Sequence, residues 1–254
     1  MGRVSNRHEP SVIGKITIVL DAFGPDTAEL GLTDLARATK LSKTTVHRLA
    51  KELVSHGFLS RSGTRYVLGT RLFELGQRVP SRKLLREAAL PFLEDVFVAT
   101  RETVHLAIID GLEVFYVERL AGHRSAGTPS AVGGHLPLHC TATGKALLAH
   151  AVPSVVEQVL VAGLKRRTPF TIVVPSLLIA ELAKIRDAGA AIEREETRLG
   201  FISVAAPVFD RSGGVLAAIS VTGPAERLDP ERVVGTVRAA ARGLTRVLHS
   251  SIVQ

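Results

Sequence analysis

The chain has 254 residues, of which 46% are hydrophobic, so it can bury a substantial core and is not a disordered protein. Its single cysteine, Cys140, excludes a disulfide framework and predicts a cytoplasmic protein. No apolar stretch approaches the roughly 20 residues that cross a bilayer, and the N-terminal residues show no signal-peptide core, so no membrane partner is predicted. Its net charge of +8 is concentrated in residues 1–80, which hold 12 Lys and Arg against 7 Asp and Glu, as in a module that binds a polyanion.

A first helix is predicted over residues 12–23, because apolar residues recur at helical spacing before the Gly24-Pro25 break. The apolar face of this helix is made of Ile13, Ile16, Val19, Leu20 and Phe23. A shorter second helix should begin after Thr33, which is a suitable N-cap. We expect the first helix to pack behind a helix-turn-helix motif at residues 32–58, of which this second helix is the first half.

The third helix carries the features of a DNA-recognition helix. It should begin after the N-cap Ser42 and run to about His56, with Gly57 as its C-cap. Its apolar residues fall on one face, at Val46, Leu49, Ala50 and Leu53. The predicted DNA contacts lie on the opposite face, at Lys43, Thr44, Thr45, His47, Arg48 and Lys51. Charge alone does not distinguish DNA from RNA or an anionic membrane, but the helix-turn-helix pattern favours double-stranded operator DNA.

A β-hairpin is predicted directly after this helix. Residues 58–61 and 65–68 alternate in hydrophobicity around a turn that contains Gly63. A hairpin in this place is the wing of a winged-helix domain, and we expect Arg61 and Arg65 to contact phosphate or the minor groove. The alternative is a small helical hairpin whose charged face is only solvated, because such patterns also occur outside DNA-binding proteins.

The segment after the hairpin predicts a short helix, a linker and a long helix. Residues 69–78 suit the short helix, and residues 76–82, which include a proline and a serine, suit the linker. The long helix should cover residues 82–100, although Pro91 must kink it or end a first segment. Its core-facing residues are expected to be Leu84, Leu85, Ala88, Phe92 and Val96.

We therefore predict a DNA-binding domain at residues 1–78, a linker helix at residues 79–100 and a second domain at residues 101–254. In the second domain, strand and helix patterns mix. Asp110-Gly111 predicts a tight hairpin turn, and Asp229-Pro230 predicts the start of a final helix. The fold class is therefore α+β in two domains, a winged helix followed by an antiparallel sheet with flanking helices.

Six stretches of the chain occur in a distinctive order and spacing. They read LTDLARATKLSKTTVHRLAKELVSHGFL, RYVLGTRLFELG, ETVHLAIIDGLEVFYVERL, GGHLPLHCTATGKALLA, TPFTIVVPS…LAKIRDAGAAIEREE and GFISVAAPVFDRSGGVLAAISVTGP. Together they resemble the IclR family of bacterial transcription regulators over nearly the whole chain. The resemblance implies a winged helix-turn-helix, a linker helix and a GAF-like α/β sandwich that binds a small effector. It also implies a homo-oligomer, dimer or tetramer, that represses or activates operons for the catabolism of small organic or aromatic acids and for other metabolic pathways.

By this resemblance, the effector pocket lies in the second domain. The residues that it implies are Ser125, Thr128, Ala142, Thr143, Glu193, Ser203, Ser220 and Thr222. Independently, Ser220 and Thr222 share one face of a predicted strand. Glu193 would repel a carboxylate unless it is protonated or accepts a hydrogen bond from a ligand hydroxyl. The alternative is that the Ser and Thr side chains only bond to neighbouring backbone.

No metal, cofactor or catalytic group is predicted. His139 and Cys140 are adjacent on a strand, so their side chains would point to opposite faces, and one cysteine gives no zinc-binding spacing. Gly144-Lys145 lacks the glycines and the hydroxyl residue of a phosphate-binding loop. We therefore expect a ligand-responsive regulator and not an enzyme. The alternatives are an enzyme acting on a small molecule with a nucleic-acid-docking N-terminal module, and an architectural DNA-binding protein without a ligand.

Overall fold

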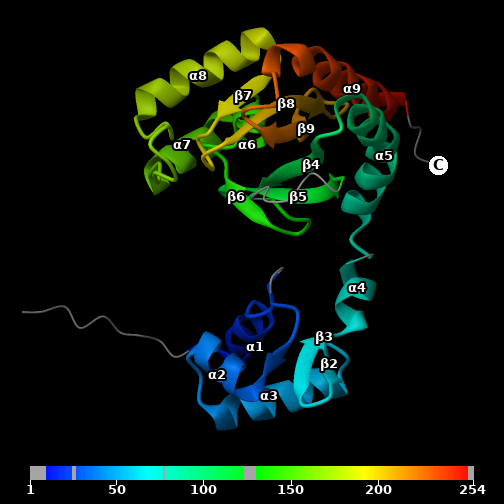
Figure 1. Cartoon of the computed structure of the whole chain (residues 1–254), viewed down its shortest axis with the longest axis vertical. Helices are drawn as coiled ribbons and strands as arrows, with labels where there is room; N and C mark the ends of the chain where they lie inside the picture. The colour runs from blue at the N-terminus through cyan, green and yellow to red at the C-terminus, as the bar shows by residue number, and fades with distance from the viewer. Residues whose placement is uncertain (1–9, 25–26, 77, 123–129, 251–254) are drawn as a thin grey trace, which may run out of the picture. The chain divides into compact units, whose positions relative to one another are not determined.

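The computed structural model describes residues 10–24, 27–76, 78–122 and 130–250, and the chain divides into two compact units between Lys83 and Leu84 (Figure 1). The first unit has one hydrophobic core, and the second has two, one on each side of its sheet. None of the described helices combines the length and the apolar character that a bilayer-spanning helix requires.

The described residues of the first unit form a helical core with a small antiparallel sheet in the order β1-β3-β2. Its helices are α1 (Val12–Leu20), α2 (Leu32–Thr39), α3 (Lys43–Ser55) and α4 (Thr70–Gly76). Its strands are β1 (Leu30–Gly31), β2 (Leu59–Ser62) and β3 (Arg65–Leu68). The apolar faces of α1, α2 and α3 meet in a core that includes Val19, Leu35 and Leu49. This arrangement confirms the predicted helix-turn-helix followed by a hairpin wing.

Two helix ends in the first unit differ from the predictions. α1 ends at Leu20 rather than at Phe23, and Ile13 is 76% exposed, so it is not part of the core. α2 has Gly31 as its N-cap instead of Thr33, because the Asp34 carboxylate accepts a hydrogen bond from the Gly31 backbone N–H at 3.4 Å. The two residues of β1 were not predicted as a strand, since a segment this short shows no alternation.

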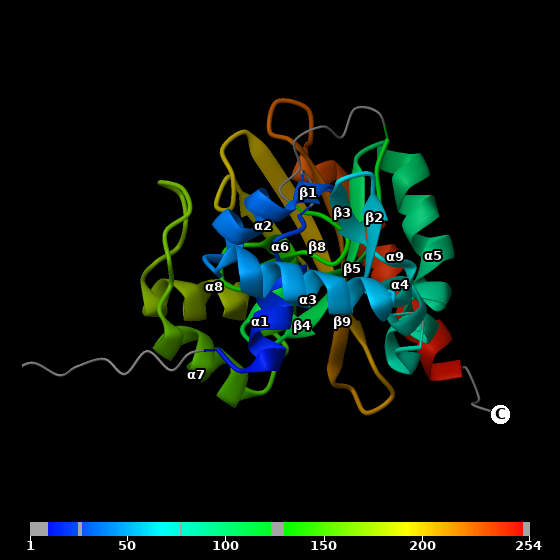
Figure 2. The ribbon, with the colours of Figure 1, turned by 90° about the horizontal axis from the view of Figure 1, so that it is seen from below.

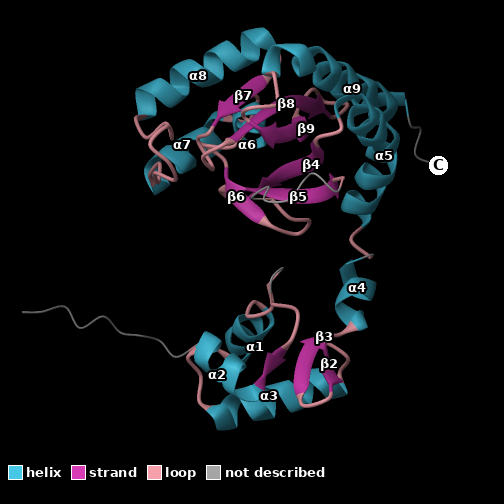
Figure 3. Cartoon of the chain, in the orientation of Figure 1, coloured by secondary structure: helices cyan, strands magenta, loops and turns pink. Residues whose placement is uncertain are grey.

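The second unit is built on a six-stranded antiparallel sheet in the order β6-β5-β4-β9-β8-β7 (Figure 3). Its strands are β4 (Thr103–Asp110), β5 (Glu113–Leu120), β6 (His135–Pro137), β7 (Ala191–Arg194), β8 (Phe201–Phe209) and β9 (Val215–Pro224). Its helices are α5 (Pro80–Thr100), α6 (Ala142–Leu148), α7 (Pro153–Ala162), α8 (Pro175–Ala188) and α9 (Pro230–Ser250). This architecture confirms the predicted α+β class.

Helices cover both faces of the large sheet. α5 and α9 pack on one face, against apolar strand residues that include Val204 and Ile219. α6 and α8 pack on the other face, where the strands carry small side chains such as Ala205 and Ala218. Since side chains alternate along a strand, Ser203 and Ser220 lie on this second face as well. The sheet therefore carries an apolar face and a mixed face.

The long helix α5 runs without interruption from Pro80 to Thr100, so Pro91 does not end it. Its buried face follows helical spacing through Leu85, Ala89, Leu93 and Val96. Leu84 was predicted to face the core but is 66% exposed, because it precedes this buried stripe by one residue and points away from the sheet.

Replacing Leu93 with alanine should lower the free energy of unfolding of the second unit by about 2–5 kcal/mol, because the side chain is fully buried in the core under α5. The matched control is Leu84→Ala on the same helix, which should change this free energy by no more than about 0.5 kcal/mol. Urea denaturation followed by circular dichroism, at one protein concentration, measures both. Equal losses in the two variants would contradict the packing described for α5.

Candidate functional site

Helix α3 presents an exposed polar face in the first unit, and Figure 2 gives a second view of this helix and of the hairpin that follows it. Ser42 caps the helix, since its Oγ accepts a hydrogen bond from the Thr45 N–H at 3.2 Å. The exposed predicted contacts are Lys43, Thr44, His47, Arg48 and Lys51. Thr45 is half-buried, and its Oγ1 lies 2.8 Å from Ser42 Oγ, so its hydroxyl belongs to the cap. The face away from the core is therefore basic and hydroxyl-bearing.

The two predicted wing contacts also bond within the first unit. Arg61 donates a hydrogen bond to the Tyr66 hydroxyl at 3.3 Å, and its guanidinium lies 5.1 Å from the centre of that ring. Arg65 donates to the Glu29 carbonyl at 3.3 Å, and its Nη2 lies 3.8 Å from Asp34 Oδ2. These bonds hold the hairpin in place. Both arginines remain exposed, so their DNA contacts stay a prediction.

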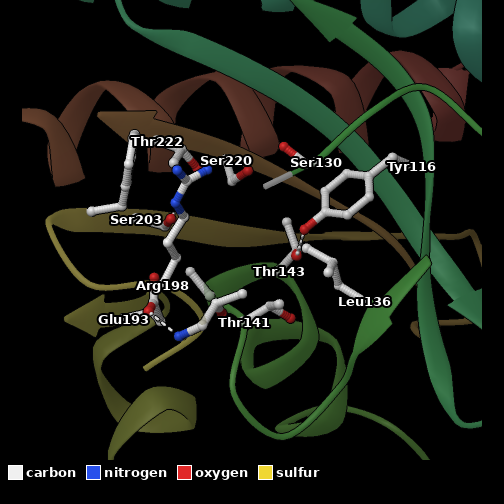
Figure 4. Close-up of a pocket in the computed structure, with 13 residues that line it drawn as sticks. Tyr116, Ser130, Leu136, Thr141, Thr143, Glu193, Arg198, Ser203, Ser220 and Thr222 are labelled. Atoms are coloured by element: carbon white, nitrogen blue, oxygen red, sulfur yellow. Dashed lines mark hydrogen bonds between the residues drawn. The ribbon is translucent and has the colours of Figure 1, made fainter. Parts of the chain in front are cut away.

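A pocket in the second unit brings together six of the eight predicted effector residues (Figure 4). They are Ala142, Thr143, Glu193, Ser203, Ser220 and Thr222. The other two, Ser125 and Thr128, lie outside the described residues. The open space between the lining side chains is about 20 Å³, which is room for one or two water molecules. A larger ligand therefore requires some of these side chains to move.

The pocket also contains residues that the sequence analysis did not single out. They are Tyr116, Ser130, Leu136, Thr141, Thr197, Arg198 and Phe201. Arg198 lies in the loop that joins β7 to β8, the two strands that carry the predicted site residues Glu193 and Ser203. Its positive charge between two predicted site residues could have indicated from the sequence that Arg198 lines the pocket. For Tyr116 and Ser130 no local pattern indicates that they reach the pocket, because the pairing of β5 with β4 brings Tyr116 there and a bond to His105 of β4 holds Ser130 there.

The hydroxyl groups of the pocket are bonded to one another and to a buried histidine. Ser203 Oγ lies 2.9 Å from Thr222 Oγ1. The two ring nitrogens of His105 lie 2.6 Å from Ser130 Oγ and 3.4 Å from Ser220 Oγ. Burial, with a smaller effect of Arg119, lowers the pKa of His105 to about 3, so the ring is neutral near pH 7. The network therefore positions hydroxyls without adding charge.

Glu193 is the acidic group of the pocket and is only 2% exposed. Its Oε1 accepts a hydrogen bond from the Thr197 N–H at 2.9 Å. Burial raises the pKa of Glu193 to about 7, and the negative charge of Glu196 also raises it. The hydrogen bond from Thr197 and the positive charge of Lys145 lower this pKa in part. Lys145 is itself buried, forms an ion pair with Glu196 and donates to the Ile192 carbonyl at 3.0 Å. Lys145 thus supports the wall of the pocket and is not part of a phosphate-binding loop.

The adjacent His139 and Cys140 have separate structural partners. His139 Nε2 lies 3.0 Å from the Lys165 carbonyl oxygen, and the Cys140 carbonyl accepts a hydrogen bond from the Thr197 hydroxyl at 2.7 Å. Burial raises the pKa of the Cys140 thiol to about 11, which disfavours the reactive thiolate. Among the described residues, no three His, Cys, Asp or Glu side chains are grouped so that they could hold a metal ion.

Two family models match the chain. The model of the IclR helix-turn-helix domain matches residues 13–63, and the model described as bacterial transcriptional regulator IclR C-terminal matches residues 77–246. The transcriptional regulator XynR of Escherichia coli is 33% identical over 237 residues, which are 91% of this chain and 94% of XynR. KdgR of the same organism is 32% identical over 242 residues, which are 92% of this chain and 91% of KdgR.

A solved structure shares the fold over nearly the whole length. It is an IclR homologue from Microbacterium hydrocarbonoxydans in complex with 4-hydroxybenzoate, with a TM-score of 0.87 and 34% identity. The match covers 95% of this chain and all of that chain. The similarity therefore extends over both units and is not confined to the helix-turn-helix.

The raised pKa of Glu193 predicts that the protein loses stability as the pH rises from about 4.5 to about 7, because over this range the folded state keeps a proton that the unfolded chain releases. Glu193→Gln cannot ionise and removes this contribution. The free energy of unfolding of the variant, relative to the wild type, should therefore increase by roughly 3 kcal/mol between about pH 4 and pH 8. Urea denaturation at several pH values measures this difference. A difference that does not change with pH would contradict the raised pKa.

Proposed function

Because the chain belongs to the IclR family of bacterial transcriptional regulators, we propose that it binds operator DNA through α3 and senses a small organic acid in the pocket of its second unit. The matches confirm the resemblance that the six sequence stretches indicated. The relatives regulate transcription and are not enzymes, so the alternative of an enzyme with a docking module is wrong. The exposed basic face of α3 is the observation that carries the proposal.

Operator recognition is assigned to the first turns of α3, which would lie in the major groove. Arg48 can bond to guanine O6 and N7 or to a phosphate, and the hydroxyl of Thr44 can bond to a phosphate. A single recognition helix reads few base pairs, so we propose that a homo-oligomer, dimer or tetramer, binds paired half-sites. The DNA-binding part is residues 1–78 in this proposal.

The effector part of the proposal is supported by pocket chemistry and by a relative. The pocket offers several hydroxyl groups and the cation of Arg198, which suits a small polar acid. The related Microbacterium protein was solved with 4-hydroxybenzoate, an aromatic hydroxy acid. Effector binding changes operator affinity only if the effector binds the two states of the protein with different affinity. We assign this coupling to the linker helix, residues 79–100.

The protein should bind duplex DNA from upstream of its own gene about a thousandfold more tightly than a scrambled duplex, with a steep dependence on salt. Fluorescence anisotropy across salt concentrations measures both affinities, and added carboxylic acids should change the operator affinity. An architectural DNA-binding protein would bind both duplexes equally and would not respond to acids. Equal binding that persists for genomically selected sites and with acids present would overturn the proposed function.

Arg48→Gln should weaken operator binding by about 1–3 kcal/mol, because Arg48 is exposed at the predicted base-contacting surface of α3. The loss on scrambled DNA should be smaller if the side chain contacts a base. Arg246→Gln, exposed on α9 in the second unit, removes the same charge and should leave both affinities unchanged. Unchanged operator binding in Arg48→Gln would remove this residue from the interface.

A further inference from the structure

The loop between β7 and β8 brings an arginine to the pocket. Among the lining residues that the structure describes, Arg198 is the only cation. Figure 4 shows its side chain reaching from the loop toward the hydroxyl groups of Ser203, Ser220 and Thr222. The Arg198 guanidinium also lies 5.3 Å from the centre of the Phe201 ring, where a cation–π contact orients it.

The loop holds this arginine from both sides. On one side, Thr197 is fixed through its N–H to Glu193 at 2.9 Å and through its hydroxyl to the Cys140 carbonyl at 2.7 Å. On the other side, the Gly200 N–H bonds to the Glu195 carboxylate at 2.8 Å. The backbone that carries Arg198 is therefore anchored, and its long side chain is exposed to solvent.

The charges of the pocket make this arginine necessary for an anionic ligand. The other charged lining group is Glu193, a carboxyl that opposes a second negative charge. The remaining polar groups are hydroxyls, and those of Ser203 and Thr222 already bond to each other. A guanidinium binds a carboxylate with two parallel hydrogen bonds, which neither a hydroxyl pair nor a lysine reproduces.

We propose that Arg198 binds the carboxylate of the effector and sets the preference of the pocket for acids over their neutral analogues. This inference rests on the proposed function, in which the pocket takes a small organic acid. It assigns to one residue of this chain the discrimination between an acid and an amide of the same shape.

The test compares three acids with their amides by isothermal titration calorimetry: 4-hydroxybenzoate, benzoate and lactate, each against the corresponding amide. The wild type should bind at least one acid more tightly than its amide. Arg198→Gln should bind that acid about tenfold to a hundredfold more weakly and bind the amide unchanged. Arg198→Lys should lie between the two, because it keeps the charge and loses the paired geometry.

The matched control is Arg194→Gln, four residues earlier on β7. Arg194 is exposed, lies 3.7 Å from Glu231 and does not line the pocket, so this variant should bind acids like the wild type. Operator binding without acid and the melting temperature of each variant show that the protein remains folded. These two measurements therefore separate a loss of ligand binding from a loss of folding.

The possible outcomes separate the inference from the proposed function. Acid binding by Arg198→Gln that equals the wild type, or an equal loss for acid and amide, would overturn the role of Arg198 and leave the regulator function intact. If the wild type binds operator DNA but none of the acids, the organic-acid part of the proposed function fails, and the role of Arg198 fails with it.

Discussion

The sheet of the second unit is covered by helices on both faces, and the position of the pocket follows from this constraint. Because side chains alternate along β9, Ile219 enters the core under α5 and α9, whereas Ser220 faces the opposite side. On that side α6 approaches closely over small residues. A Cβ added to Gly144 would lie 2.2 Å from the Leu138 carbonyl oxygen. The pocket lies where Ser and Thr take the place of Ala in the same alternation.

Buried hydroxyl groups on this mixed face require partners, and strand pairing supplies them. Ser203 stands opposite Thr222 in the β8–β9 register, and His105 stands opposite Ser220 in the β4–β9 register. Both pairs are hydrogen-bonded. A ligand that enters the pocket must replace the bonds that it breaks, since an unpaired buried polar group costs about 1–3 kcal/mol. The network therefore favours ligands that fill the space and also carry polar groups matching those of the pocket.

The charges around the pocket are arranged in two layers. Lys145 and Glu196 form a buried pair behind the wall, and Glu193 and Arg198 line the pocket itself. Burial is the main cause of the raised pKa of Glu193; Glu196 of this pair raises it further, and Lys145 lowers it. An anion bound beside Glu193 would favour its protonated form for the same electrostatic reason, which would link anion binding to the uptake of a proton. In the first unit the charges that we propose to contact DNA instead lie on the exposed surface of α3.

Much of the local structure could be predicted from the sequence. The N-cap Ser42, the tight turn at Asp110-Gly111 and the Asp229-Pro230 start of α9 lie where the sequence indicated them. The start of α2 could not be predicted, because pairing of Gly31 with Arg65 of the hairpin keeps the chain extended up to that glycine.

The sequence by itself determined the places of the helices and the basic face of α3, because these depend on the spacing of nearby residues. It determined the family through six stretches that follow one another in a distinctive order along the chain. Six of the pocket residues followed from the family resemblance, and for two of them, Ser220 and Thr222, a shared strand face gave independent support. Only the tertiary structure decided that Tyr116 and Ser130 join them. The physical reason is that the pairing of β4 with β5 and β9 places Tyr116 and Ser220 in one sheet, and a bond across 25 positions joins Ser130 to His105 of β4. No local periodicity encodes such contacts.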